Sequence, residues 1–238
     1  MTNIVTPRVQ LLAHTKIDEK AISEYMGVQG ASTDAETLLT MAGRNCYRSF
    51  HRPNTKTHDD ADYLRRTLGE QGHWSIAEHA TATLYFTGVS RAFLTELTRH
   101  RHLSFSVESQ RFIDADNINI VVPPAVRASE DPFVLRNFAN AADEAVNAYM
   151  ATRDELENLP KKQRNEAARG LLPNCVETRM VVTANLRAWY EVIQRRTQPD
   201  ADAEMQQVMR LAYEALQDRK STRLNSSHTS KSRMPSSA

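Results

Sequence analysis

The segment from Arg99 to Arg111 concentrates side chains that are able to do chemistry. It reads RHRHLSFSVESQR, with three arginines, two histidines and three serines. Guanidinium groups pair bidentately with phosphate, and serine hydroxyls add neutral donors. These residue types suit a ligand that carries several anionic oxygens, although a solvated basic helix end has the same composition.

Helical geometry would spread the first three cations apart. If the helix expected from Ser90 ends near Arg101, the side chains of Arg99, His100 and Arg101 point about 100° apart at its last turn. The helix dipole favours positive charge there. Such a fan suits two ligands side by side, or one ligand with several anionic groups. Ser109 has no obvious base to activate it as a nucleophile.

An irregular order of strands and helices must position these residues. Runs of β-branched and aromatic residues predict strands, and 3.6-residue apolar spacing predicts helices. We expect strands at residues 9–13, 81–86, 118–122 and 178–183, and helices at 34–46, 59–68, 90–99, 132–156, 160–169, 185–195 and 201–216. Asp34 can cap the first helix. Because strands and helices do not alternate regularly, we expect an α+β fold with mixed helices around a small central sheet.

Composition sets the class of protein. The 238 residues are 40% hydrophobic and 25% charged, as in an ordinary globular protein. A net charge of +1 does not suggest a nucleic-acid partner, and without 18 consecutive apolar residues we expect no membrane span. Two cysteines are too few for a disulfide framework or a zinc cage. With no secretory signal at residues 1–7, we expect a cytoplasmic protein.

The composition changes sharply near the C-terminal end. Seven of the eighteen residues from Ser221 to Ala238 are serine, and no hydrophobic period is visible, as in a disordered tail. Residues 218–228 and 232–238 also resemble the translation of a DNA-sequencing adapter on either side of a three-residue barcode. We therefore expect a folded domain at residues 1–217, cut off within its last helix, and a tail at residues 218–238.

The spacing within the cluster is similar to a known family signature. Arg99-His100-Arg101, followed after seven residues by Ser109 and then Arg111, resembles the signature of flavin-dependent thymidylate synthases. Further segments resemble that family in the same order, from about residue 9 to residue 216. They are Met41–Tyr47, Gly72–His79, Arg169–Pro173, Asn185–Arg187 and Arg196.

The resemblance implies an activity. The family makes dTMP from dUMP, with methylenetetrahydrofolate as the carbon donor, NADPH as the electron donor and FAD as the hydride carrier. Its members are homotetramers whose active sites combine several subunits, and no protein thiolate attacks the pyrimidine. Cys175 agrees with this mechanism, because no adjacent histidine lowers its pKa, and we interpret it as a buried structural residue.

The resemblance also implies roles for individual residues. Arg196 would be catalytic, because its guanidinium would contact the uracil edge and stabilise negative charge on N3 and O2. The residues implied at dUMP are Glu96, Arg99, Ser109, Gln110, Arg111, Arg196 and Arg169, the last from a neighbouring subunit. The residues implied at FAD are His73, Ser75, Arg99, His100, Arg101, Asn185 and Arg187. No metal ion is implied.

Three positions depart from the family pattern. Val107 stands where the family has Gln or Glu, with Glu108 next to it. Glu191 and Asp200 stand where relatives often have histidine, and a carboxylate there would repel flavin phosphates. These departures leave the contacts at all three positions open.

Some of these residues allow other interpretations. His73, Glu78 and His79 contain metal-ligating side chains, but their spacing matches neither common zinc motif. Trp74 packs either in the core or against the flavin. A non-catalytic nucleotide- or RNA-binding protein could use the basic cluster as its patch, but such proteins usually carry a wider positive surface.

Overall fold

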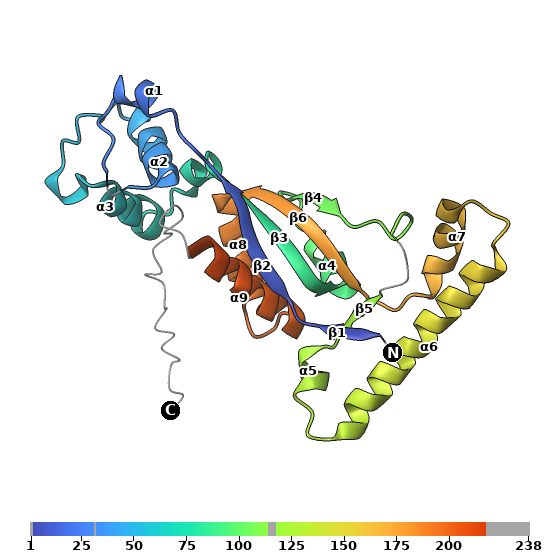
Figure 1. Cartoon of the computed structure of the whole chain (residues 1–238). Helices are drawn as coiled ribbons and strands as arrows, with labels where there is room; N and C mark the ends of the chain where they lie inside the picture. Colours follow the sequence, from blue (N-terminus) through green and yellow to red (C-terminus); the bar gives the residue numbers. More distant parts are fainter. Residues whose placement is uncertain (1, 31, 114–117, 218–238) are drawn as a thin grey trace, which may run out of the picture. The chain divides into compact units, whose positions relative to one another are not determined.

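The computed structural model describes residues 2–30, 32–113 and 118–217 (Figure 1). The chain forms two compact units. Among the described residues, we call those within 1–14 and 81–215 the sheet unit, and those within 15–80 and 216–217 the helical unit. The predicted tail at residues 218–238 lies outside the described residues. No helix of the described ranges is long and apolar enough to cross a bilayer.

An antiparallel four-stranded sheet organises the sheet unit. Its strands are β2 (Arg8–His14), β3 (Thr81–Ser90), β6 (Glu177–Asn185) and β4 (Ser104–Val107), in the order β2-β3-β6-β4. Strand β3 alternates Ala82, Leu84 and Phe86, which are almost fully buried, with half-buried side chains on the other face. A separate parallel pair joins β1 (Asn3–Val5) to β5 (Asn119–Val121).

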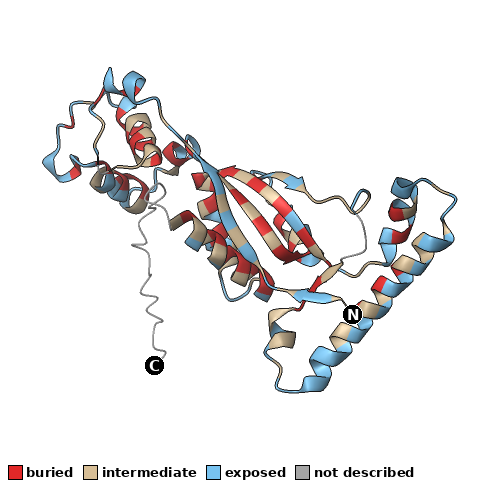
Figure 2. Cartoon of the chain, viewed as in Figure 1, coloured by how far each residue is buried: buried red, intermediate tan, exposed pale blue. Residues whose placement is uncertain are grey.

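Helices α4 (Arg91–Leu97), α8 (Leu186–Arg196) and α9 (Ala203–Gln217) supply the core against this sheet (Figure 2). The Phe86 ring lies 6.3 Å from the Trp189 ring of α8 and 6.1 Å from the Phe93 ring of α4. Trp189 also donates from Nε1 to the Ala82 carbonyl at 3.0 Å, so its polar atom is satisfied inside the core. The aromatic cluster therefore fixes the positions of α4 and α8 on one face of the sheet.

A helical arm follows β5 in the chain. It consists of α5 (Pro124–Arg127), the long α6 (Pro132–Glu155), α7 (Lys161–Ala168) and the 3₁₀ turn η5 (Arg169–Leu171). Only Ala142, Val146 and Tyr149 of α6 are buried, and Phe133, Val134 and Leu135 are exposed. One stripe of α6 packs against α7 and η5, and its other faces are open in the single chain.

The helical unit is built from short helices. They are α1 (Glu19–Ser23), α2 (Asp34–Asn45), η1 (Thr55–Thr57), α3 (Asp60–Leu64), the π-helical turn η2 (Arg65–Glu70) and η3 (Trp74–Glu78). A buried ion pair joins Arg52 to Asp60 at 2.7 Å. Arg44 is also buried, where it donates to the carbonyls of Ser49 and Thr57 and lies 4.4 Å from the Tyr63 ring centre.

The α+β class and all the long elements expected from the sequence are confirmed. The helix expected at 59–68 is confirmed, as one α-helical turn followed by a π-helical turn. Two details were wrong. Thr33 rather than Asp34 caps α2, through a reciprocal capping box with Glu36. The helix after Ser90 ends at Leu97, well before Arg101, and the serine-rich stretch after it forms β4.

Candidate active site

The last turn of α4, the segment that follows it and the last turn of α8 bring together Glu96, His100 and Arg196. Arg196 donates from Nε to His100 Nε2 at 2.9 Å and from Nη1 to Glu96 Oε2 at 3.3 Å. A helix cap on α4 and buried side chains on α8 hold these two helix ends in place. Ser90 caps α4 by accepting from the Phe93 amide at 3.0 Å, and α8 buries Val192 just before Arg196. Residues about 100 apart in the sequence therefore form one polar cluster.

His100 is a neutral acceptor in this cluster. Because Nε2 accepts a hydrogen bond from Arg196, the ring carries its proton on Nδ1. Burial lowers the pKa of His100, and the positive charges of Arg196, Arg195 and Arg99 lower it further. The Arg196 side chain is only 18% exposed, so its guanidinium orientation is set by two partners rather than by solvent.

The two flanking arginines of the predicted fan face solvent. Arg99 and Arg101 are exposed, whereas His100 between them is half-buried. Both arginines lie in turns after α4, where the amide of Arg99 bonds to the Glu96 carbonyl at 3.3 Å. The expected 100° helical spacing is therefore wrong, because α4 has already ended at Leu97. Neither guanidinium forms a salt bridge with a described residue.

Residues 109–113, here called the serine turn, follow β4. The carbonyl of Ser109 accepts from the amides of Phe112 and Ile113, at 3.1 and 3.3 Å, and its hydroxyl accepts weakly from the amide of Arg111 at 3.4 Å. Arg111 Nε lies 3.2 Å from Glu166 Oε2 of α7. The contact lacks hydrogen-bond geometry, since Arg111 Nε has no hydrogen-bond partner. Arg111 is thus an ion-paired guanidinium with unused donors.

A second group of charged side chains surrounds Glu108, and most of its members were not predicted from the sequence. Arg91 donates from Nη2 to the Glu108 carbonyl at 3.2 Å. Burial lowers the pKa of Arg91, the charge of Glu108 raises it, and that of Arg169 lowers it. Burial likewise raises the pKa of Glu108, against the opposing charge of Arg179. The sequence signal that could have identified Arg91 is its position as the first residue of α4, about two turns before Arg99.

A small cavity adjoins the serine turn. It has a volume of about 280 Å³ and is lined by side chains that include Glu108, Gln110, Glu177 and Arg179. Val107, the first departure from the family pattern, pairs with Met180 at the end of β4. Glu108 rather than Val107 therefore supplies the carboxylate on this side of the turn.

The beginning of α8 carries Asn185 and Arg187. Asn185 caps the helix, because its side-chain oxygen accepts from the Ala188 amide at 2.8 Å. Arg187 donates from Nε to Glu191 Oε1 at 2.9 Å, one helical turn further on. Glu191, the second departure, is thus paired with a residue predicted at the flavin. Asp200, the third, is exposed after the end of α8.

His73 and Ser75 belong to the helical unit. Both side chains are exposed at the start of η3, and Trp74 between them is half-buried. The structure thus brings together Glu96, His100 and Arg196 in one cluster, and it groups Ser109, Gln110 and Arg111 in one turn. Within the sheet unit, no hydrogen bond or ion pair between described residues joins the cluster to the turn.

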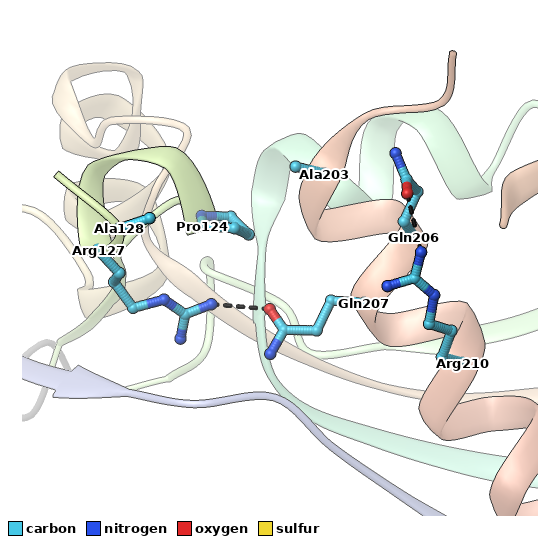
Figure 3. Close-up of a pocket in the computed structure, with 7 residues that line it drawn as sticks. All are labelled: Pro124, Arg127, Ala128, Ala203, Gln206, Gln207 and Arg210. Atoms are coloured by element: carbon cyan, nitrogen blue, oxygen red, sulfur yellow. Dashed lines mark hydrogen bonds between the residues drawn. The ribbon is translucent and has the colours of Figure 1, made fainter. Parts of the chain in front are cut away.

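A larger concavity lies elsewhere in the sheet unit, between α5 and α9 (Figure 3). Its volume is about 530 Å³, and it contains none of the predicted residues. Two arginines line it, but neutral amides engage both: Arg127 donates to Gln207 at 2.7 Å and Arg210 to Gln206 at 3.1 Å. The chemistry suggested by the sequence therefore lies at the ends of α4 and α8 and at the serine turn.

Comparison with known proteins identifies the family. The family model "Thymidylate synthase complementing protein" matches residues 28–219. The flavin-dependent thymidylate synthase of Mycobacteroides abscessus is 41% identical over 220 residues, which cover 87% of this chain and 84% of that protein. A probable flavin-dependent thymidylate synthase of Mycobacterium phage D29 is 44% identical over 209 residues, covering 84% and 88%.

Solved structures share the fold. Thymidylate synthase X from Helicobacter pylori, solved with FAD and dUMP, superposes with a TM-score of 0.60 at 21% identity, over 89% of this chain and 93% of that one. A UMP/dUMP methylase from Streptomyces cacaoi gives a TM-score of 0.66 at 20% identity, over 92% and 93%. With the family model and relatives at this identity covering most of its length, the chain belongs to the flavin-dependent thymidylate synthases.

Proposed function

We propose that this enzyme converts dUMP to dTMP with methylenetetrahydrofolate as carbon donor, NADPH as electron donor and FAD as the bound redox group. The observation that carries the proposal is the Glu96–His100–Arg196 cluster, which ties the family's signature segment to its late arginine within hydrogen-bonding distance. The Helicobacter pylori relative, solved with FAD and dUMP, supports the same ligands here.

Arg196 is the proposed catalytic residue. A guanidinium has five N–H donors, and His100 and Glu96 each occupy one of them, which leaves donors for the uracil edge. Because both partners hold its plane in place, Arg196 is preorganised to stabilise negative charge developing on N3 and O2. That charge stabilisation would polarise C5–C6 so that C6 can accept hydride.

The serine turn supplies the proposed phosphate site. Ser109, Gln110 and Arg111 would bind the phosphate and sugar of dUMP, with Glu96 and Arg99 beside the nucleotide. Glu166 neutralises Arg111 only through a poorly directed ion pair, and both partners are partly exposed. Exposed ion pairs of this kind contribute about 0–1 kcal/mol to stability. A phosphate that accepts well-directed hydrogen bonds from Arg111 can therefore displace the Glu166 carboxylate.

The chemistry of the residues proposed at FAD fits a flavin dinucleotide. Arg99 and Arg101 are exposed guanidiniums with no described carboxylate partner, as a diphosphate requires. His73, Ser75, His100, Asn185 and Arg187 complete the proposed set. FAD supplies the hydride chemistry that no side chain of the protein can perform. Since Glu191 already pairs with Arg187, it screens the arginine whose positive charge would otherwise attract the cofactor.

No cysteine takes part in the proposed mechanism. Burial raises the pKa of the Cys175 thiol, which keeps it protonated and unreactive. Cys46, in the helical unit, is exposed and forms no disulfide. This chemistry agrees with a reducing cytoplasm, which we propose as the location.

We propose that the enzyme acts as a homotetramer with shared active sites, without a nucleic-acid or membrane partner. Apolar side chains of the helical arm and the serine turn are exposed in the single chain, including Phe112, Phe133, Leu135 and Leu171. Burial of such side chains stabilises subunit contacts. In that assembly Arg169 would reach the dUMP of a neighbouring subunit.

The visible spectrum of the purified protein tests the cofactor proposal. We expect a yellow protein with flavin absorbance, and we expect the double substitution Arg99→Ala, Arg101→Ala to give colourless protein with an unchanged circular dichroism spectrum. Stoichiometric FAD in the double variant would remove these arginines from the proposed site. A colourless wild type that binds nucleotide or RNA would favour the non-catalytic alternative.

A further inference from the structure

Helix α7 contacts the serine turn through a fully buried amide. Asn165 is 0% exposed, and its Nδ2 donates to the carbonyls of Arg111 and Ile113, each at 3.2 Å. The partners are more than 50 residues apart in the sequence, so these bonds come from the tertiary fold. They connect α7 to the middle and to the last residue of the serine turn.

The other atom of the amide shows why asparagine stands here. Asn165 Oδ1 is buried and has no hydrogen-bond partner. A flipped amide would place that oxygen against two carbonyl oxygens, so the orientation is set by the two Nδ2 bonds. A buried acceptor without a partner destabilises the fold relative to an apolar side chain of the same shape. Any stabilisation that Asn165 provides must therefore come from its two hydrogen bonds to the serine turn.

Neighbouring residues of α7 reinforce the contact. Lys162, Asn165 and Glu166 have the spacing of a single helical face. Glu166 Oε2 lies 3.2 Å from Arg111 Nε, and Lys162 Nζ lies 5.6 Å from the Phe112 ring centre. The same face of α7 thus meets the backbone, the cation and the aromatic ring of the serine turn.

We propose that Asn165 is a positioning residue for the phosphate of the nucleotide substrate. By fixing the carbonyls of Arg111 and Ile113, it holds the turn in the conformation in which the Ser109 hydroxyl and the Arg111 guanidinium converge on one anion. This inference rests on the proposed role of the serine turn in dUMP binding. Losing the two bonds weakens binding of the phosphate and leaves FAD binding unchanged.

Two substitutions remove the donors in different ways. Asn165→Leu keeps a side chain that branches at Cγ and also removes the unpaired Oδ1, whereas Asn165→Ala leaves space and keeps the helix. The matched control is Asn147→Ala, on the exposed side of α6. For each FAD-loaded protein, calorimetry gives the dissociation constants of dUMP and of deoxyuridine, which has no phosphate. Hydrogen exchange of the peptide over residues 105–113 reports on the turn directly.

We expect the dissociation constant of dUMP to rise about tenfold in both Asn165 variants, because the phosphate donors are misplaced. The constant for deoxyuridine should change little, so the preference for dUMP shrinks, and exchange over residues 105–113 should quicken. Asn147→Ala should match the wild type in all three measurements.

Equal weakening of dUMP and deoxyuridine would show a merely structural role and overturn the proposal. Unchanged dUMP affinity in Asn165→Leu, or unchanged exchange in the turn, would also overturn it. If one of the two Asn165 variants fails to fold, the dUMP and deoxyuridine affinities of the other variant decide whether the proposal holds. A wild type that binds no dUMP contradicts the proposed function itself, which is a different outcome from any of these.

Discussion

Arg196 is held by two partners whose positions have a direct consequence for catalysis. Arg196→Ala should spare FAD binding, since most of the flavin contacts proposed lie elsewhere, but it should sharply lower dTMP formation. Loss of a charge-assisted contact to a developing anion costs about 3–4 kcal/mol, roughly a hundred- to a thousand-fold in rate. Arg196→Lys should recover little, because an ammonium cannot present two parallel donors. Steady-state assays measure both effects.

Arg195→Ala is the matched control for this prediction. Arg195 is exposed, whereas Arg196 is bound to Glu96 and His100. The carboxylate of Glu204, near the start of α9, does not pair with Arg196, because it accepts from the amide and hydroxyl of Ser90 at 2.8 and 2.6 Å. Near-normal turnover in Arg196→Ala together with an inactive Arg195→Ala would assign the catalytic role to Arg195.

The neutral state of His100 predicts a pH dependence of stability. Its pKa is lowered in the folded protein by burial and by the arginines that face it, Arg196, Arg195 and Arg99. The unfolded chain therefore binds more protons than the folded one below the ordinary histidine value of about 6.5, and stability falls as the pH drops from there towards the lowered pKa. His100→Gln keeps an acceptor for Arg196 but cannot titrate.

Thermal denaturation between pH 7.5 and pH 5 measures this difference. These limits lie about one unit above and about one and a half units below the ordinary histidine pKa, so they span the protonation of the histidine in the unfolded chain. The melting temperature of the wild type should fall more steeply with decreasing pH than that of His100→Gln, because the other histidines are common to both proteins. Parallel curves would mean that His100 binds its proton equally well in both states.

At the scale of elements, α8 depends on its N-terminal cap. Asn185 is both the cap, through the Ala188 amide, and a proposed FAD contact. Asn185→Asp keeps a capping oxygen but places a negative charge at the proposed cofactor site, so stability should be retained and flavin content should fall. Asn185→Ala should lose about 1 kcal/mol of stability as well. Melting curves and the flavin-to-protein absorbance ratio separate the two functions, and full flavin content in Asn185→Asp would show that the residue is only a cap.

Strong apolar periodicity made the long helices and strands predictable from the sequence. Short elements such as β4 depend on tertiary contacts, which the sequence does not show. Strands β3 and β6 and helices α6, α8 and α9 carry clear apolar patterns, and the sequence predicts them to within a few residues at most boundaries. Strand β4 was missed because Ser104 and Ser106 have the composition of a loop, and only pairing with β6 makes the segment a strand.

The residues of the candidate site also fall into those that the sequence predicts and those that only the fold reveals. The Arg99–Arg111 spacing identified the signature residues, since a motif is written in the local sequence. Arg91 and Asn165 were missed because their contacts, with the Glu108 carbonyl and the Arg111 carbonyl, depend on distant segments meeting in the fold. Every residue has a backbone carbonyl, so the residue type of the acceptor does not indicate which side chain will donate to it.

At the scale of the whole molecule, the expected domain at residues 1–217 spans both compact units. We propose that residues 218–238 contribute nothing to folding or activity, because they resemble an adapter translation and lack any apolar period. Deleting them should leave the melting temperature and flavin content unchanged. A clear decrease in either would show that the tail is a working part of the protein.

The formation of dTMP by the purified enzyme tests the central claim most directly. The assay combines the FAD-loaded protein with dUMP, methylenetetrahydrofolate and NADPH, and chromatography detects the product. We predict that dTMP appears with all components, disappears when the folate, NADPH or dUMP is omitted, and falls strongly in Arg196→Ala. A flavin-loaded wild-type protein that makes no dTMP from the complete mixture would contradict the proposed reaction.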